Sequence, residues 1–422
     1  MNAFDVQHWR SYFPALTAAR VFMDNPGGTQ IARPAIERIQ RYLLETNANR
    51  GGAFPTSRQS DAVLEQARQA MADFLNATRP EEIVFGPNMT SLTLALSRSL
   101  ASQLSAGDEI VVTRLDHDAN ISPWLHAADA SGATVRWADF DVEDCRLRME
   151  ELLPMLGPRT RLVAIGYASN AVGTINAVAR IAAAARQVGA WCFVDAVQLA
   201  PHRAIDVQAL GCDFLALSVY KLFGPHVGAL YGRYDLLDQL PAFNVRPASS
   251  RPPRKFETGT QNHEGIAGAL GALEYLAEIG RSVGQAAPAE LRAAYQGQRL
   301  DLKAGMAAIE AYERPLTAAL IERLLAIPGV EVYGPSLAED LADRVPTVSI
   351  RTPGISPREV ADRLGKEGIY VWDGNFYAPS VTERLGVEDS GGLVRIGLAH
   401  YNTLDEVDQL TSAVGRMVGQ GG

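Results

Sequence analysis

Lys221 and Asp195 are the two residues whose chemistry is easiest to connect. An apolar segment, residues 191–194, ends at Asp195, and a second apolar segment, residues 214–217, is followed by Ser218 and then by Lys221. The carboxyl ends of parallel strands meet at one edge of an α/β sheet, so we expect both side chains to face one crevice. An amine that can form a Schiff base, opposite a carboxylate that keeps a ring nitrogen protonated, is the pair that pyridoxal phosphate (PLP) enzymes use. The alternative is a surface lysine and an aspartate that closes a turn.

Residues suited to the phosphate of such a cofactor follow another apolar segment, residues 82–85. A Gly-Pro turn leads to Asn88, Met89 and Thr90, where we predict that a helix begins. The free N–H groups at a helix N-terminus bind anions, and hydroxyl side chains add hydrogen bonds. Ser218 would supply a further hydroxyl. The alternative is an ordinary N-cap at Asn88 or Thr90.

Three more polar residues follow apolar segments and suit the ring of the cofactor. His117 could stack on a flat ring and shuttle protons, and Asn170 and Gln198 could donate hydrogen bonds to a phenolic oxygen. Each also has a plain alternative as a hydrogen-bonded surface residue. Arg395, after a short apolar strand, could hold a substrate carboxylate through two parallel hydrogen bonds, or it could form a surface ion pair.

The elements that would position these residues alternate between strand and helix patterns. Seven strands are expected, at 82–85, 109–113, 134–138, 162–165, 191–194, 214–217 and 227–231. Helix-length segments separate several of them, which predicts an α/β fold with a mostly parallel sheet between helices. A smaller C-terminal α/β unit follows. We therefore divide the chain into a helical segment (1–20), a large cofactor-binding domain (21–290) and a small domain (291–422).

Composition excludes several other classes of protein. The 422 residues are 47% hydrophobic and 21% charged, with a formal net charge of −9, which argues against nucleic acid or an anionic membrane as a partner. No apolar run is long enough for a membrane span, and the N-terminus does not look like a secretory signal. The three cysteines have no metal-like spacing, so we expect no metal site and a cytoplasmic location.

Several motifs together resemble a known group of enzymes. They are HDAN (117–120), SNAVGT (169–174), VDAVQ (194–198), SVYK (218–221), GTQN (259–262) and RIGLAHYNT (395–403). With them, most of the chain resembles the class V, fold-type I PLP enzymes, and among these the cysteine desulfurase-like, or selenocysteine lyase, branch.

The resemblance implies a role for each matching residue. Lys221 would form the Schiff base with PLP, Asp195 would pair with the pyridine nitrogen, and His117 would stack on the ring. Asn170 and Gln198 would bond the ring hydroxyl, Thr90 and Ser218 would hold the phosphate, and Arg395 would bind the carboxylate of an amino-acid substrate. Thr260 would reach the phosphate of a neighbouring subunit, which implies a homodimer with active sites at the subunit interface.

One departure from the family pattern bears on the reaction. Desulfurases of this branch carry a nucleophilic cysteine on a loop of the small domain, whereas here the loop is Gly374–Ala378, with Tyr377 in place of the cysteine. A phenol cannot accept sulfur as a persulfide, which requires a thiolate. We therefore expect β-elimination of the C–S lyase type, with Tyr377 as a second acid. Amino-acid epimerisation, racemisation and class V transamination are the alternatives, as is a PLP-binding module without turnover.

Overall fold

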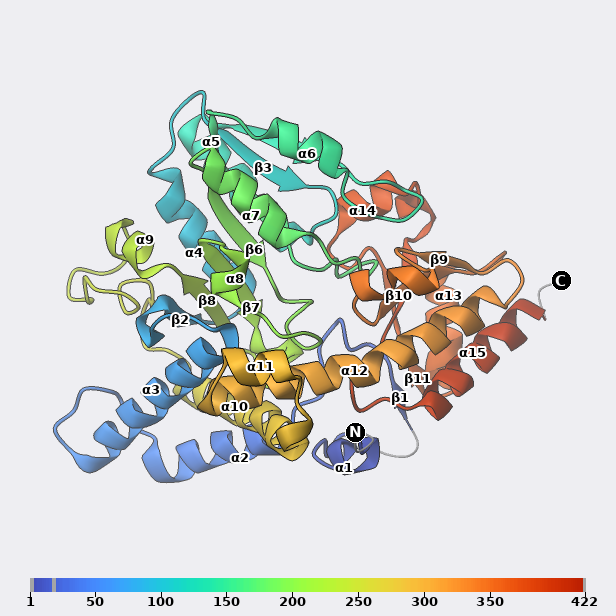
Figure 1. Ribbon diagram of the computed structural model, residues 1–422, viewed down its shortest axis with the longest axis horizontal. Helices are drawn as coiled ribbons and strands as arrows, with labels where there is room; N and C mark the ends of the chain where they lie inside the picture. Colours follow the sequence, from blue (N-terminus) through green and yellow to red (C-terminus); the bar gives the residue numbers. More distant parts are fainter. Residues whose placement is uncertain (1–3, 17–19, 420–422) are drawn as a thin grey trace.

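The computed structural model describes residues 4–16 and 20–419, which form a large and a small sheet with their covering helices (Figure 1). The N-terminal segment contains helix α1, Val6–Arg10. The rest of the segment predicted to be helical includes residues 1–3 and 17–19, which lie outside the described residues.

The large sheet has seven strands in the order β2-β8-β7-β6-β5-β3-β4. Strand β8 runs antiparallel to its neighbours β2 and β7, and the other pairs are parallel. The strands are β2 (Ile83–Gly86), β3 (Glu109–Thr113), β4 (Thr134–Ala138), β5 (Thr160–Gly166), β6 (Trp191–Asp195), β7 (Phe214–Ser218) and β8 (Gly228–Gly232). The predicted mostly parallel sheet is confirmed, and each strand begins and ends within two residues of the expected position.

Helices cover both faces of this sheet, which explains why its central strands are continuous apolar runs rather than alternating ones. Helices α4 and α5 pack on one face, in a cluster with Phe193 and Phe214. Helices α3, α7 and α10 pack on the other, in a cluster with Val194 and Leu215. The helices of this part of the chain are α2 (Arg33–Arg41), α3 (Pro55–Leu75), α4 (Met89–Ala101), α5 (Ser122–Ser131), α6 (Met149–Met155), α7 (Val178–Gln187), α8 (Val207–Leu210), α9 (Tyr234–Gln239), α10 (His263–Val283) and α11 (Ala289–Ala294).

The C-terminal part of the chain builds a second, antiparallel sheet in the order β12-β13-β10-β9. Its strands are β9 (Glu331–Tyr333), β10 (Thr347–Arg351), β12 (Trp372–Gly374) and β13 (Leu393–Gly397). Helices α13 (Pro357–Lys366), α14 (Pro379–Arg384) and α15 (Leu404–Gly419) accompany it. A second hydrophobic cluster, which includes Val348, Ile396 and Leu410, lies between sheet and helices.

Two elements join the large and small parts. Helix α12, Gly297–Leu325, crosses between them, so that its Leu302 belongs to the large hydrophobic cluster and its Leu320 to the small one (Figure 1). Near the other end of the chain, β1 (Val21–Phe22) pairs with β11 (Ile369–Tyr370) of the small part. The predicted domain limits at residues 20 and 290 stay a prediction.

Among residues 4–16 and 20–419, no helix is long and apolar enough to cross a membrane. The same residues contain no group of three or more His, Cys, Asp or Glu side chains that could hold a metal ion.

Candidate active site

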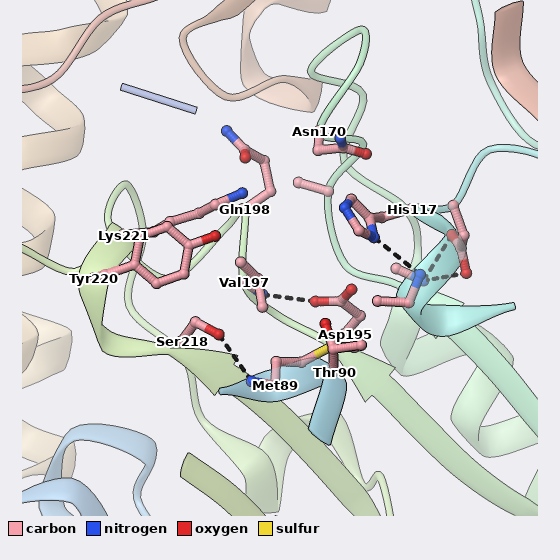
Figure 2. Close-up of a pocket in the computed structure, with 14 residues that line it drawn as sticks. Met89, Thr90, His117, Asn170, Asp195, Val197, Gln198, Ser218, Tyr220 and Lys221 are labelled. Carbon is pink, nitrogen blue, oxygen red and sulfur yellow. Dashed lines mark hydrogen bonds between the residues drawn. The ribbon is translucent and has the colours of Figure 1, made fainter. Parts of the chain in front are cut away.

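A cavity that encloses about 470 Å³ of space, part of it open to solvent, lies at the carboxyl ends of the parallel strands. Eight of the residues predicted for a cofactor site line it: Met89, Thr90, His117, Asn170, Asp195, Gln198, Ser218 and Lys221. They follow β2, β3, β5, β6 and β7 in turn, and Figure 2 shows their side chains arranged around one space.

Lys221 and Asp195 are both buried in this cavity, and burial favours the neutral form of each side chain. The pKa of Lys221 is lowered to about 8 by burial and by the charge of Arg395, against the opposing effects of Asp195 and Asp24. Burial raises the pKa of Asp195 to about 6, although a hydrogen bond from Val197 N to Oδ1 (2.9 Å) and the charge of Lys221 favour the carboxylate. Near pH 7 the site thus holds a carboxylate and a lysine that loses its proton readily.

In the side-chain amides of Asn170 and Gln198, the NH2 group donates a hydrogen bond, whereas the oxygen has no partner among the described residues. Asn170 Nδ2 donates to Phe376 O (2.8 Å), and Gln198 Nε2 donates to Thr347 Oγ1 (2.8 Å). Asn170 Oδ1 and Gln198 Oε1 are buried and have no hydrogen-bond partner among the described residues. Buried polar atoms are normally paired, so both amides are suited to a polar ligand group.

His117 is a neutral ring at this cavity. Burial lowers its pKa to about 3, helped by the positive charges of Lys221 and Arg395. Its Nδ1 accepts a hydrogen bond from Ala119 N (3.0 Å), which places the ring proton on Nε2. An uncharged imidazole that is held in place by the backbone N–H of Ala119 is suited to stacking on a flat ring.

The N-terminus of α4 borders the cavity. Asn88 caps this helix by accepting from Ser91 N (2.8 Å), and its side chain does not line the cavity. Met89 N donates to Ser218 Oγ (2.9 Å), which ties the helix start to the end of β7, and Thr90 is exposed at the rim. Asn88 is therefore an N-cap, and Thr90 and Ser218 lie at the N-terminal end of the helix, where the predicted phosphate role stays a prediction.

Arg395 and Tyr377 lie next to the cavity without lining it. Arg395 is buried, donates from Nη1 to Asn170 O (3.2 Å), and lies with its guanidinium 4.4 Å from the centre of the Phe376 ring. Tyr377 is 77% exposed and stacks on His117, with ring centres 5.8 Å apart. Its carbonyl accepts from Asp118 N (2.7 Å), so the loop of the small part is attached to the large part at the cavity mouth.

Thr260 is also outside the cavity of its own chain, where it is exposed. Conversely, Asp116 and Tyr220 line the cavity although no role was predicted for them. Asp116 is buried, accepts from Gly166 N (2.9 Å) and Asn120 Nδ2 (2.7 Å), and burial raises its pKa to about 7. Its position directly before His117, at the end of a strand, was the available signal.

Known proteins resemble this chain in sequence and in fold. Residues 21–303 and 298–410 match the class V aminotransferase family. The chain belongs to this family. It is 36% identical over 424 residues to an aminotransferase-like protein of Gibberella zeae and 31% identical over 435 residues to a cysteine desulfurase of Cronobacter sakazakii, with 98% of both chains covered in each case.

Solved structures of cysteine desulfurases are also similar. The one from Thermococcus onnurineus superposes with a TM-score of 0.87 at 27% identity and full coverage of both chains. The one from Escherichia coli superposes with a TM-score of 0.83 at 29% identity, covering 99% of this chain and all of the other. The class V family is PLP-dependent, so this chain is a fold-type I, PLP-dependent enzyme.

The cavity residues fit that cofactor. The unpaired amide oxygens of Asn170 and Gln198 can accept the proton of a ring hydroxyl, and a half-turn of the Gln198 amide would let it donate to that oxygen, because the Thr347 hydroxyl can then donate to Gln198 Oε1. Asp195 is the buried carboxylate that a pyridine nitrogen needs, and the start of α4 with Ser218 offers an anion site.

Proposed function

We propose that this PLP enzyme acts on a sulfur-substituted amino acid and catalyses β-elimination of the C–S lyase type. The observation that supports this most is the pairing of Lys221 and Asp195 in a cavity whose neighbouring loop carries Tyr377 instead of a thiol. When bound, the cofactor supplies an electron sink for the electrons of a broken bond at the substrate Cα. The products would be a thiol, pyruvate and ammonia.

Each residue of the site would have a separate role in this reaction. Arg395 would hold the α-carboxylate, and Lys221, with its lowered pKa, would take the proton from Cα. Asp195 would keep a proton on the ring nitrogen, and the neutral ring of His117 would cover one face. As the Cβ–S bond breaks, the phenol of Tyr377 would donate a proton to the leaving sulfur. Thr90, Ser218 and the start of α4 would hold the phosphate.

The cysteines support elimination over sulfur transfer to the enzyme. Cys145, Cys192 and Cys212 are all the cysteines of the chain, and all three are buried with free thiols. Burial raises the pKa of Cys145 and of Cys212 to about 12 and raises that of Cys192 as well, so none is a ready thiolate. None lines the cavity. Free thiols also agree with the cytoplasmic location that we propose.

We also propose a homodimer in which Thr260 completes the phosphate site of the partner subunit. Three residues before Thr260, the buried Glu257 accepts from Arg68 Nη1 (2.8 Å) and Phe85 N (3.0 Å), which anchors this loop outside its own cavity. Exposed large apolar side chains suit a covered surface: Phe243 and Val245 lie near this loop in sequence, Leu43 and Leu44 follow α2, and Phe54 directly precedes α3.

Proton NMR in D2O on the PLP-loaded protein tests the reaction. Cysteine, S-methylcysteine and alanine would be supplied in turn. We expect pyruvate from the sulfur substrates, and loss of both pyruvate and the visible absorption of bound cofactor in Lys221→Ala. Exchange of the α-proton without breakdown would instead support epimerisation or transamination, the latter in line with the name of the Gibberella relative. If none of the three compounds gave pyruvate or exchanged its α-proton, the proposed lyase activity would be contradicted.

A further inference from the structure

Arg395 already has a carboxylate neighbour inside the protein. Its Nη2 lies 3.3 Å from Asp24 Oδ1, while its Nη1 donates to Asn170 O and its Nε is buried with no hydrogen-bond partner among residues 4–16 and 20–419. Nε and Nη2 form one edge of the planar guanidinium, the edge that binds a carboxylate through two parallel hydrogen bonds. Asp24 is therefore paired with one of the two nitrogens of this edge, and the other has no partner.

One face of the guanidinium is not open to a ligand, because the Phe376 ring covers it at 4.4 Å. The Nη1 side is taken by the carbonyl of Asn170. The Nε–Nη2 edge is thus where a carboxylate has an unpaired donor to bind, and Asp24 stands beside that donor.

The backbone of Asp24 is fixed, and its side chain is more exposed than that of Arg395. Asp24 forms a bridge with Gly397, Gly397 N donates to Met23 O (2.7 Å), and Asn25 Nδ2 donates to Gly397 O (2.7 Å). The carboxylate lies over Gly27, where a Cβ would come within 2.5 Å of Oδ2. The Asp24 side chain is 17% exposed, against 5% for that of Arg395.

We propose that Asp24 is a specificity-determining residue: a resident carboxylate that pairs with Arg395 in the free enzyme and must yield the Nε–Nη2 edge to the α-carboxylate of the substrate. The proposal rests on the role proposed for Arg395. A buried guanidinium without a partner is costly, so Asp24 stabilises Arg395 until the substrate arrives. A ligand that lacks a carboxylate does not displace Asp24, whereas an amino acid exchanges one ion pair for another with a better geometry.

Binding of two matched ligands to the PLP-loaded protein tests the competition. 3-(Methylthio)propanoate carries the carboxylate without the amine, and 2-(methylthio)ethylamine carries the amine without the carboxylate. Asp24→Asn removes the competing charge at constant shape, so calorimetry should show binding of the acid tightened at least about tenfold, the scale of one charge-assisted hydrogen bond. Binding of the amine, a cation that gains nothing from the freed edge, should not tighten.

Further variants separate this proposal from the proposed function. Asp24→Glu keeps the competing charge and should not gain affinity for the acid, and Asp24→Ser, a second neutral variant, should behave like Asp24→Asn if the latter does not fold. Unchanged or weaker binding of the acid in both neutral variants would overturn the role of Asp24. If Arg395→Met also left binding of the acid intact, the carboxylate site itself would be wrongly assigned.

Discussion

At the scale of single residues, burial decides which groups of the cavity carry charge. The pKa of Lys221 is lowered to about 8, and the groups around this lysine shift its pKa in opposite directions. Burial and Arg395 favour the neutral amine, while Asp195 and Asp24 favour the ammonium. His117 has lost its charge entirely at neutral pH, with a pKa near 3. The cavity thus combines a neutral ring with a lysine that can act as nucleophile or base.

The lowered pKa of Lys221 predicts how fast the apoprotein binds PLP at different pH values. The neutral amine attacks, and its fraction rises about tenfold per pH unit below the pKa and levels off above it. The rate at which the visible absorption of bound PLP appears should therefore rise up to about pH 8 and then level off. For a lysine with the ordinary pKa of 10.5, this rate would keep rising above pH 8. Arg395→Met removes a positive neighbour and should move the midpoint upward. A wild-type midpoint near 10.5 would contradict the effect of burial.

At the scale of elements, the cofactor site depends on how closely β8 approaches the start of α4. A Cβ at Gly228 would lie 2.5 Å from the carbonyl carbon of Asn88, within the backbone of the helix cap. Met89 N also bonds Ser218 Oγ at the end of β7, and β7 pairs with β8. The sheet therefore holds the N-terminus of α4 in place through backbone contact and a hydrogen bond.

Gly228→Ala should displace the start of α4. We expect a loss of about 1–3 kcal/mol in the free energy of unfolding, as for other overpacked sites, and weaker binding of PLP. Gly232→Ala, in the same strand, is the matched control: its Cβ would meet the Leu237 side chain at 2.8 Å, which can move without shifting α4. Denaturant unfolding and titration with PLP measure both effects. Equal PLP affinity in the two variants would count against this view of the helix start.

At the scale of the whole molecule, one chain holds nearly all of the predicted cofactor site but leaves Thr260 exposed outside it. The proposed homodimer accounts for this, because the loop anchored by Glu257 would present Thr260 to the partner's cavity.

Mixing two subunits that each bind PLP poorly tests whether Thr260 acts across the interface. Thr260→Ala should weaken PLP binding by roughly 10- to 100-fold, the value of one hydrogen bond to a charged group. A dimer of Lys221→Ala and Thr260→Ala subunits would regain one intact site, with Lys221 from one chain and Thr260 from the other. Tight PLP binding at half of the sites in the mixed dimer is the expected result. Failure to restore it would show that Thr260 does not act in trans.

The sequence by itself determined the order of strands and helices and the polar residues after each strand. An apolar run of four or five residues followed by a turn is a local pattern, and parallel connections then bring residues such as His117, Asp195 and Lys221 to one edge. This is why eight predicted cofactor residues line one cavity.

Only the tertiary structure decided which distant residues share a partner. Asp24 and Asn170 both meet Arg395, and Phe376 covers it, although these residues come from separate stretches of the chain. No spacing rule links them, because the contacts depend on how the small part docks on the large one. Protonation states were decided in the same way, since the pKa of a buried group follows from the atoms that replace water around it.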